Sequence, residues 1–142
     1  VVLYSPIQMA SDLPENYFEK DGKTLKPGFQ FIRDMTTDWE ESKAIAGEVG
    51  DYVAYARKKR NGDEWFLGAI TDEKSRKLSL ALHFLDAKKK YTAEIYRDGS
   101  SADWKTNPYD LEIEKKTVTA KDVMDVSLAS SGGIAVRFKP VK

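Results

Sequence analysis

The chain has 142 residues, no cysteine and 23 basic against 23 acidic side chains, so its formal net charge is zero. A neutral chain has no overall field to attract nucleic acid or an anionic membrane surface, and a chain without cysteine has no disulfide framework. Hydrophobic residues make up 41% of the sequence, which together with the balanced charge excludes an intrinsically disordered protein. The length predicts one domain, or a small domain with an attached segment.

Residues 1–41 contain three of the five prolines and only short apolar runs. The apolar run at residues 1–9 starts without a cap or turn, which favours a helix end cut from a longer chain over the start of a processed protein. Pro14 and Pro27 each precede a possible short helix, because proline suits the first helical turn. Such short helices are unstable alone, so we expect their apolar side chains to pack against another surface.

From about residue 43 the sequence alternates between apolar and polar side chains, which is the period of a β-strand. The two earliest strands, residues 52–57 and 65–71, are more continuously apolar, as central strands are. Asn61-Gly62 between them predicts a hairpin with a type I′ turn. The later strands are expected at residues 78–84, 91–96, 111–114, 124–128 and 134–138.

Seven or eight strands of this kind predict an all-β fold, an antiparallel two-sheet β-sandwich. We place the sandwich at residues 42–142 and the helical segment that precedes it at residues 1–41. No apolar run approaches the 18 residues of a membrane-spanning helix, so no membrane span is predicted.

Residues with catalytic chemistry are present but form no recognisable constellation. His83 is the only histidine, and its place on the polar side of a strand favours a surface role over a triad or metal site. Gly132-Gly133 lies between two strands and not before a helix, so it is no phosphate loop. Glycoside hydrolysis needs two opposed carboxyl groups. Spacing alone does not pair the candidates Asp34, Asp38, Glu40, Glu41, Asp98 and Asp103.

Two basic clusters, residues 57–60 and 88–90, are expected to be solvated hairpin ends, because they lack the interleaved aromatic residues of a single-strand nucleic-acid site. Residues 98–103 alternate oxygen-bearing side chains as calcium loops do, but lack the spacing and closing glutamate of an EF-hand. An ordinary polar loop is the favoured interpretation.

The three tryptophans are the best candidates to face a sugar, since an aromatic ring packs against the C–H groups of a pyranose. Trp65 lies in an apparently central strand and is expected in the core, and Trp39 is expected to pack at the junction between the two regions. Trp104 lies in the polar loop 98–110, where it either binds sugar or fastens the loop to the sandwich. Tyr109 in the same loop is the second candidate carbohydrate-binding residue.

Several separate segments resemble, in order, the C-terminal part of glycoside hydrolase family 97, a family of α-glucosidases and α-galactosidases. Residues 5–17 are similar to the end of that family's (β/α)₈ barrel, and residues 31–42 to the passage from the barrel into the C-terminal domain. Strands of the C-terminal sandwich resemble residues 50–57, 65–71, 83–85 and 95–99.

The resemblance implies a parent enzyme that is periplasmic or secreted and whose catalytic carboxylates and calcium ligands lie in the barrel. None of them maps onto this sequence, so we expect no catalytic residue, no metal ligand and no cofactor in this chain.

The expected function is that of a non-catalytic C-terminal accessory domain, which buttresses the barrel of an α-glycosidase that hydrolyses α-linked glucosides or galactosides. The alternative is a carbohydrate-binding module for oligo- or polysaccharides that uses Trp104 and Tyr109. A free-standing enzyme would need a pocket of convergent titratable groups, and the sequence favours it least. Exposed apolar helices at the N-terminus would also favour self-association.

Overall fold

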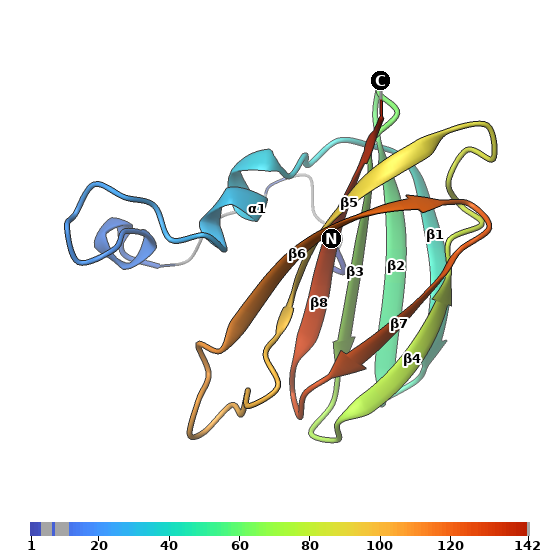
Figure 1. Ribbon diagram of the computed structural model, residues 1–142. Coiled ribbons are helices and arrows are strands. Elements are labelled where there is room, and N and C mark those ends of the chain that lie inside the picture. The colour runs from blue at the N-terminus through green and yellow to red at the C-terminus, as the bar shows by residue number, and fades with distance from the viewer. Residues whose placement is uncertain (4–6, 8–11, 142) are drawn as a thin grey trace.

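The computed structural model describes residues 1–3, 7 and 12–141 (Figure 1). Across these residues the helices are a 3-10 helix, η1 (Pro14–Tyr17), and a short α-helix, α1 (Phe29–Asp34). The remaining elements are strands, namely β1 (Trp39–Glu48), β2 (Tyr52–Lys59), β3 (Trp65–Thr71), β4 (Arg76–Ala81), β5 (Lys90–Asp98), β6 (Leu111–Thr119), β7 (Val123–Leu128) and β8 (Gly133–Pro140). This arrangement confirms the predicted all-β fold with a short helical segment before it.

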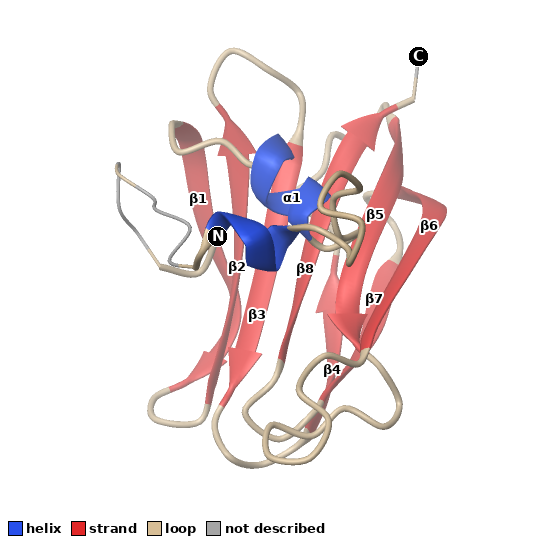
Figure 2. Cartoon of the chain, turned by 90° about the vertical axis from the view of Figure 1, so that its left-hand side faces the viewer, coloured by secondary structure: helices blue, strands red, loops and turns tan. Residues whose placement is uncertain are grey.

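The strands form two antiparallel sheets, one of six strands in the order β1-β2-β3-β8-β5-β6 and one formed by β4 and β7. The last strand, β8, lies between β3 and β5, so the larger sheet is complete only when the C-terminal strand has joined it. Strands β1 and β6 form its two edges. The β4–β7 pair covers one face of this sheet, and α1 lies over the other (Figures 1 and 2).

The main core lies between the two sheets. Alternate side chains of each strand point into it, because successive residues of a strand face opposite sides. Trp65 and Phe138 of the larger sheet pack there with Phe84, which follows β4. Its largest fully buried aliphatic side chains are Leu67, Leu80, Leu82, Ile95, Met124, Leu128 and Val136.

The opposite side of the six-stranded sheet, which we call the outer face, has a smaller apolar cluster of its own. Phe66 on β3 is fully buried, although it points away from the main core. Phe31 of α1 meets Phe66 and Tyr96 edge-on, with ring centroids 6.0 and 5.3 Å apart. Trp39 packs against Phe66 from the other side. The short helix is therefore held by tertiary packing, as its length requires.

Most sequence-based expectations for the strands are confirmed, but strand β1 was not among the expected strands, and two further points need correction. Residues 82–84 leave β4 and form a turn, so His83 is an exposed loop residue whose Nδ1 lies 3.1 Å from the carbonyl oxygen of Ala120. The β2–β3 hairpin exists, but its turn is not type I′, because only Asn61 of the Asn-Gly pair has a positive φ. The Lys59 amide reaches Glu64, so a longer loop joins these strands.

Strand β1 begins at Trp39, so the expected boundary between residues 41 and 42 falls inside this strand. Most of the expected helix end at residues 1–9, and the first half of the family-like segment 5–17, lie outside the described residues. No helix in the described part of the chain has the length and apolarity needed to cross a membrane.

Candidate functional site

The first residues of the chain lie on the outer face and are bound there by a buried arginine. Arg57 of β2 is only 4% exposed. Its guanidinium donates to the carbonyl oxygens of Val1 (2.6 Å) and Val2 (3.4 Å) and to the hydroxyl of Ser42. A β-carbon at Gly68 would lie only 3.0 Å from the Cβ of Val1, so glycine at this position lets the segment approach the strand closely.

A second arginine fastens α1 to the same face. Arg137 of β8 contacts Asp34 at the end of α1 (2.6 Å) and Glu64 (2.8 Å), and its guanidinium lies over the Phe66 ring. Burial disfavours the charged form of Arg137, but its hydrogen bond with Glu64 and the carboxylates around it outweigh that effect and raise its pKa.

Glu94 completes this charged group on the outer face. Its buried carboxylate contacts Lys115 at 2.9 Å, Lys139 at 3.2 Å and Arg137 at 3.8 Å. Burial favours its protonated form, yet the hydrogen bonds from the two lysines prevail and lower the pKa of Glu94. A buried carboxylate with several cations stays ionised, so this group orders charges around α1 and is not poised to exchange a proton.

Exposed apolar side chains are distributed unequally over the molecule. Many lie on the outer face, on the segment that covers it or at its margins: Leu13, Ile32, Val49, Ile70, Leu111 and Ile113. On the β4–β7 sheet the only exposed large apolar side chain among the described residues is Val123. The other exposed side chains of that sheet are polar, namely Lys77, Ser79, Asp125 and Ser127, and Ser79 donates a hydrogen bond to Asp125. The outer face thus resembles a surface that another body covers, whereas the opposite side resembles one that faces solvent.

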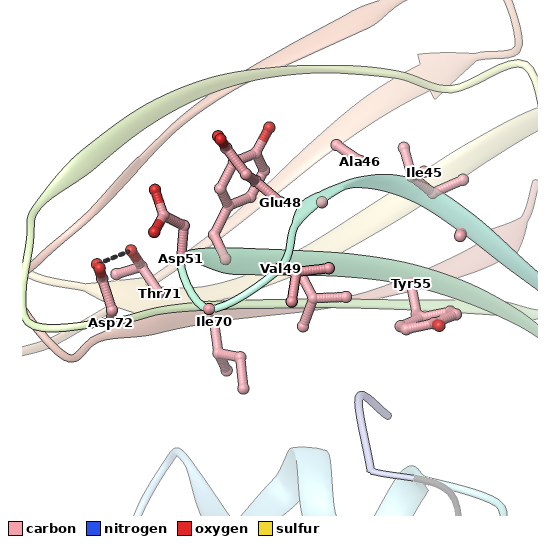
Figure 3. A pocket seen from close by; sticks show the side chains of 14 residues that line it. Ile45, Ala46, Glu48, Val49, Asp51, Tyr55, Ile70, Thr71 and Asp72 are labelled. Carbon is pink, nitrogen blue, oxygen red and sulfur yellow. Dashed lines mark hydrogen bonds between the residues drawn. The ribbon is translucent and has the colours of Figure 1, made fainter.

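The β1–β2 hairpin borders a hollow of about 590 Å³ at one margin of the outer face. Figure 3 shows Val49, Tyr55 and Ile70 projecting to the same side of the hairpin. Three carboxylates line it, of which Asp51 and Asp72 both pair with Arg76, while Glu48 has no ion pair among the described residues. The hollow is therefore an apolar depression whose rim keeps a negative charge.

The loop between β5 and β6 holds the two candidate sugar-binding residues. Trp104 is 56% exposed and Tyr109 is 92% exposed. Lys105 lies over the Trp104 ring at 4.8 Å, and a tryptophan this exposed does not fasten the loop to the sandwich. Internal hydrogen bonds order the loop instead: the Thr106 amide donates to the Asp103 carboxylate, and the Ser101 hydroxyl donates to the Asp110 carboxylate.

The carboxylates that the sequence offered as catalytic candidates are engaged in structural contacts. Asp34 pairs with Arg137 and Asp38 with Arg60, while Asp98 accepts from the backbone amides of Ala129 and Gly133. Glu40 pairs with Lys58, Glu41 with Lys43, and Asp103 caps its own loop. Within the described residues no group of three or more histidine, cysteine or acidic side chains is arranged to hold a metal ion.

One expectation about the basic clusters is wrong. Arg57 is not a solvated hairpin residue, because the N-terminal segment covers it.

Sequence analysis also missed Arg137, Glu94 and Phe66 as residues of the outer face. The alternation of β3, β5 and β8 places these side chains on the side away from the main core, but no local pattern indicated that a second layer would cover them. Trp65 in the core and Trp39 at the junction are confirmed.

The sequence of residues 38–139 matches the family described as "Glycosyl-hydrolase 97 C-terminal, oligomerisation". A retaining alpha-galactosidase of Bacteroides thetaiotaomicron is 33% identical over an alignment 144 residues long, gaps included, and the alignment covers 98% of this chain and 20% of that protein. The structure of a glycoside hydrolase family 97 enzyme from Pseudoalteromonas sp. strain K8, in complex with acarbose, superposes with a TM-score of 0.92 at 53% identity. This match covers 100% of the chain and 22% of that enzyme.

A putative alpha-N-acetylgalactosaminidase of Bacillus halodurans C-125 shares the fold, with a TM-score of 0.50 and 13% identity over 75% of this chain. The chain spans about a fifth of the length of the first two relatives.

Proposed function

Because this chain belongs to the glycosyl-hydrolase 97 C-terminal family, we propose that it is the non-catalytic accessory domain of an α-glycosidase and buttresses the catalytic part of that enzyme. The relatives are about five times longer than the chain, so they contain ample sequence for a separate catalytic domain. The candidate carboxylates of this chain are bound in ion pairs and backbone contacts, which supports a structural role.

The observation that carries the proposal is the unequal distribution of apolar side chains. Val49, Ile70, Leu111 and Ile113 lie exposed at the margins of the outer face, while the β4–β7 side is polar. An exposed apolar patch beside a structured segment is typical of a domain interface. We therefore assign the outer face, including Leu13 and Ile32 on its covering segment, to contact with the catalytic part.

Arg57 and Arg137 give this contact a fixed geometry in the proposal. They bind the segment before the sandwich at two separate points, Val1–Val2 and Asp34. These contacts fix the positions of Val1–Val2 and of α1 on the outer face. The catalytic part and the sandwich would then move as one body.

The substrate class is part of the proposal and rests on the relatives. One relative is described as a retaining alpha-galactosidase, and another family 97 enzyme was solved with acarbose bound. We propose that the parent enzyme hydrolyses α-linked galactosides or glucosides.

The test uses Arg57→Met in the full-length enzyme, with Arg60→Met as the matched control on the exposed side of the same hairpin. Loss of the buried guanidinium leaves two carbonyl groups without a donor, which costs about 1–3 kcal/mol. We expect thermal inactivation of Arg57→Met to accelerate while kcat on 4-nitrophenyl α-glucoside or α-galactoside stays within about twofold. A fall in kcat of a hundredfold or more in a folded variant would show that this domain takes part in the chemistry.

A second candidate function is sugar binding by the β5–β6 loop. The observation in its favour is that Trp104 and Tyr109 are both exposed on a hydrogen-bonded loop, and such aromatic residues can stack on pyranose rings. Saturable quenching of tryptophan fluorescence by maltotriose, lost in Trp104→Ala, would support it. Unchanged tryptophan fluorescence at millimolar sugar would leave the accessory role as the only proposed function.

A further inference from the structure

The loop between β2 and β3 contains an asparagine whose side chain is unengaged. Asn61 is exposed in this loop, and its carboxamide makes no hydrogen bond among the described residues. The backbone amide of the next residue, Gly62, donates no backbone hydrogen bond within the described part of the chain either. An electrophilic carboxamide carbon and a free amide nitrogen are therefore neighbours in the sequence, in a part of the surface that water reaches.

The two other asparagines of the chain lack this combination. Asn16 donates its side-chain amide to a nearby carboxylate, and it precedes Tyr17, whose β-carbon restricts the backbone. Asn107 donates to Ser101 and precedes Pro108, whose nitrogen carries no hydrogen to lose. The chain therefore offers one asparagine whose neighbours permit a reaction with the backbone, and two internal comparisons.

We propose that Asn61 is a site of spontaneous covalent modification, at which its carboxamide is lost and the β2–β3 loop acquires a carboxylate. The Gly62 nitrogen attacks the side-chain carbon Cγ of Asn61, so an N–Cγ bond forms. The Cγ–Nδ2 bond breaks, and ammonia leaves with the proton of the Gly62 amide. Water then opens the five-membered imide. Cleavage of the N–Cγ bond gives aspartate, and cleavage between this nitrogen and the main-chain carbonyl carbon gives isoaspartate.

The position of the pair within the loop allows the backbone to reach the geometry for ring closure. Gly62 has no β-carbon, so more backbone angles are open to it than to any other residue. The base of the loop is closed by the Lys59 amide, which donates to the Glu64 carbonyl oxygen. Asn61 and Gly62 lie beyond this bond, so they can change conformation without breaking the pairing of β2 with β3. Local opening of an exposed loop costs far less free energy than unfolding of the domain.

The reaction changes the charge of the loop. The formal net charge of the chain is zero, so each conversion makes the chain more acidic by one negative charge. The new carboxylate lies two residues from Asp63, whose own carboxylate is already paired with Lys89 at 2.7 Å. Isoaspartate also lengthens the main chain by one atom. The modification goes beyond the accessory role and does not depend on it.

The experiment follows the folded, full-length protein during incubation at mildly alkaline pH, which favours loss of the Gly62 amide proton. Peptide mass spectrometry measures the loss of each asparagine, and labelling by a protein isoaspartate methyltransferase measures isoaspartate. We expect Asn61 to react about tenfold faster or more than Asn16 and Asn107, because only its neighbour lacks a β-carbon and keeps an amide hydrogen.

Gly62→Ala is the matched variant. A β-carbon at this position would lie 3.7 Å from its nearest neighbour, the Cδ of Lys59, so the loop accommodates it. We expect conversion of Asn61 in this variant to slow about tenfold or more, because the added carbon narrows the backbone angles available for ring closure. Asn61→Gln, which moves the carboxamide one carbon further from the backbone, should remove the isoaspartate signal.

The proposal is overturned if Asn61 stays intact in the folded protein, or if it reacts no faster than the other two asparagines. It is also overturned if Gly62→Ala reacts as fast as the wild type. Aspartate without isoaspartate would overturn it as well, because direct hydrolysis of the side chain gives aspartate alone. None of these outcomes tests the contact of the outer face with the catalytic part, which the inactivation rate of Arg57→Met measures separately.

Discussion

At the scale of single residues, charged side chains on the outer face select one position for the segment that covers this face. Arg57 and Glu94 are buried and Arg137 is half-buried, and a charge in such a place is tolerated only where hydrogen bonds and opposite charges compensate for lost water. Arg57 has carbonyl oxygens and a hydroxyl as partners, while Arg137 and Glu94 belong to one network of opposite charges. Each arginine binds a different part of the segment before the sandwich, so the two select a single position for it.

Glu94 makes the stability of the domain depend on pH. Its folded-state pKa lies below the ordinary value of 4.5, so the stability it contributes is complete above that value and is lost as the pH falls through the lowered pKa. We expect the free energy of unfolding of wild-type protein to exceed that of Glu94→Gln at pH 6, and the difference to shrink towards pH 3. Urea denaturation at several pH values measures it.

The control for this prediction is Glu48→Gln, at an exposed position at the end of β1. Its effect should be small at every pH. A Glu94→Gln penalty that stayed constant from pH 6 to pH 3 would contradict the assignment of Glu94 as an ionised member of the network.

At the scale of elements, α1 is a six-residue helix that depends on the sheet beneath it. Its cap residue makes no side-chain hydrogen bond, and an isolated helix of this length is not stable in water. Phe31 supplies the missing stabilisation by packing between the rings of Phe66 and Tyr96. The position of α1 on the sheet therefore depends on the two aromatic contacts of Phe31 and on the Asp34–Arg137 ion pair.

Replacing Phe31 with alanine should release this helix. We expect a loss of about 1–3 kcal/mol in the free energy of unfolding and faster proteolysis within residues 18–28. The neighbouring Ile32→Ala is the control, because Ile32 is exposed on the same helix and should cost less than about 1 kcal/mol. Equal effects of the two substitutions in urea denaturation would show that α1 is not held through Phe31.

At the scale of the whole molecule, the six-stranded sheet has two covered faces and two edges. One face packs against β4 and β7, and the other lies under α1 and the N-terminal residues. Strands β1 and β6 form the edges; β1 is interrupted by two register shifts, whereas β6 pairs with β5 in unbroken register.

Much of the fold could be predicted from the sequence because apolar and polar side chains alternate along each strand, and this alternation is a local property. The period of two in residues 91–96 and 134–138 reappears as β5 and β8. The same method failed where local pattern and tertiary contact disagree. Leu82 and Phe84 alternate with His83 as strand residues do, yet both enter the core from a turn that ends β4. The exposure of Trp104 was likewise undecided, since a loop tryptophan can be buried or free.

The sequence by itself determined the fold class, most strands, the helical start, the core position of Trp65 and the resemblance to a glycosidase family. These features depend on residue type and spacing over a few positions. Only the tertiary structure decided that Arg57 would be buried, that Arg137 would meet Asp34, and which strands would become the edges of the sheet. Those outcomes depend on contacts between residues far apart in the chain, which side-chain periodicity does not encode.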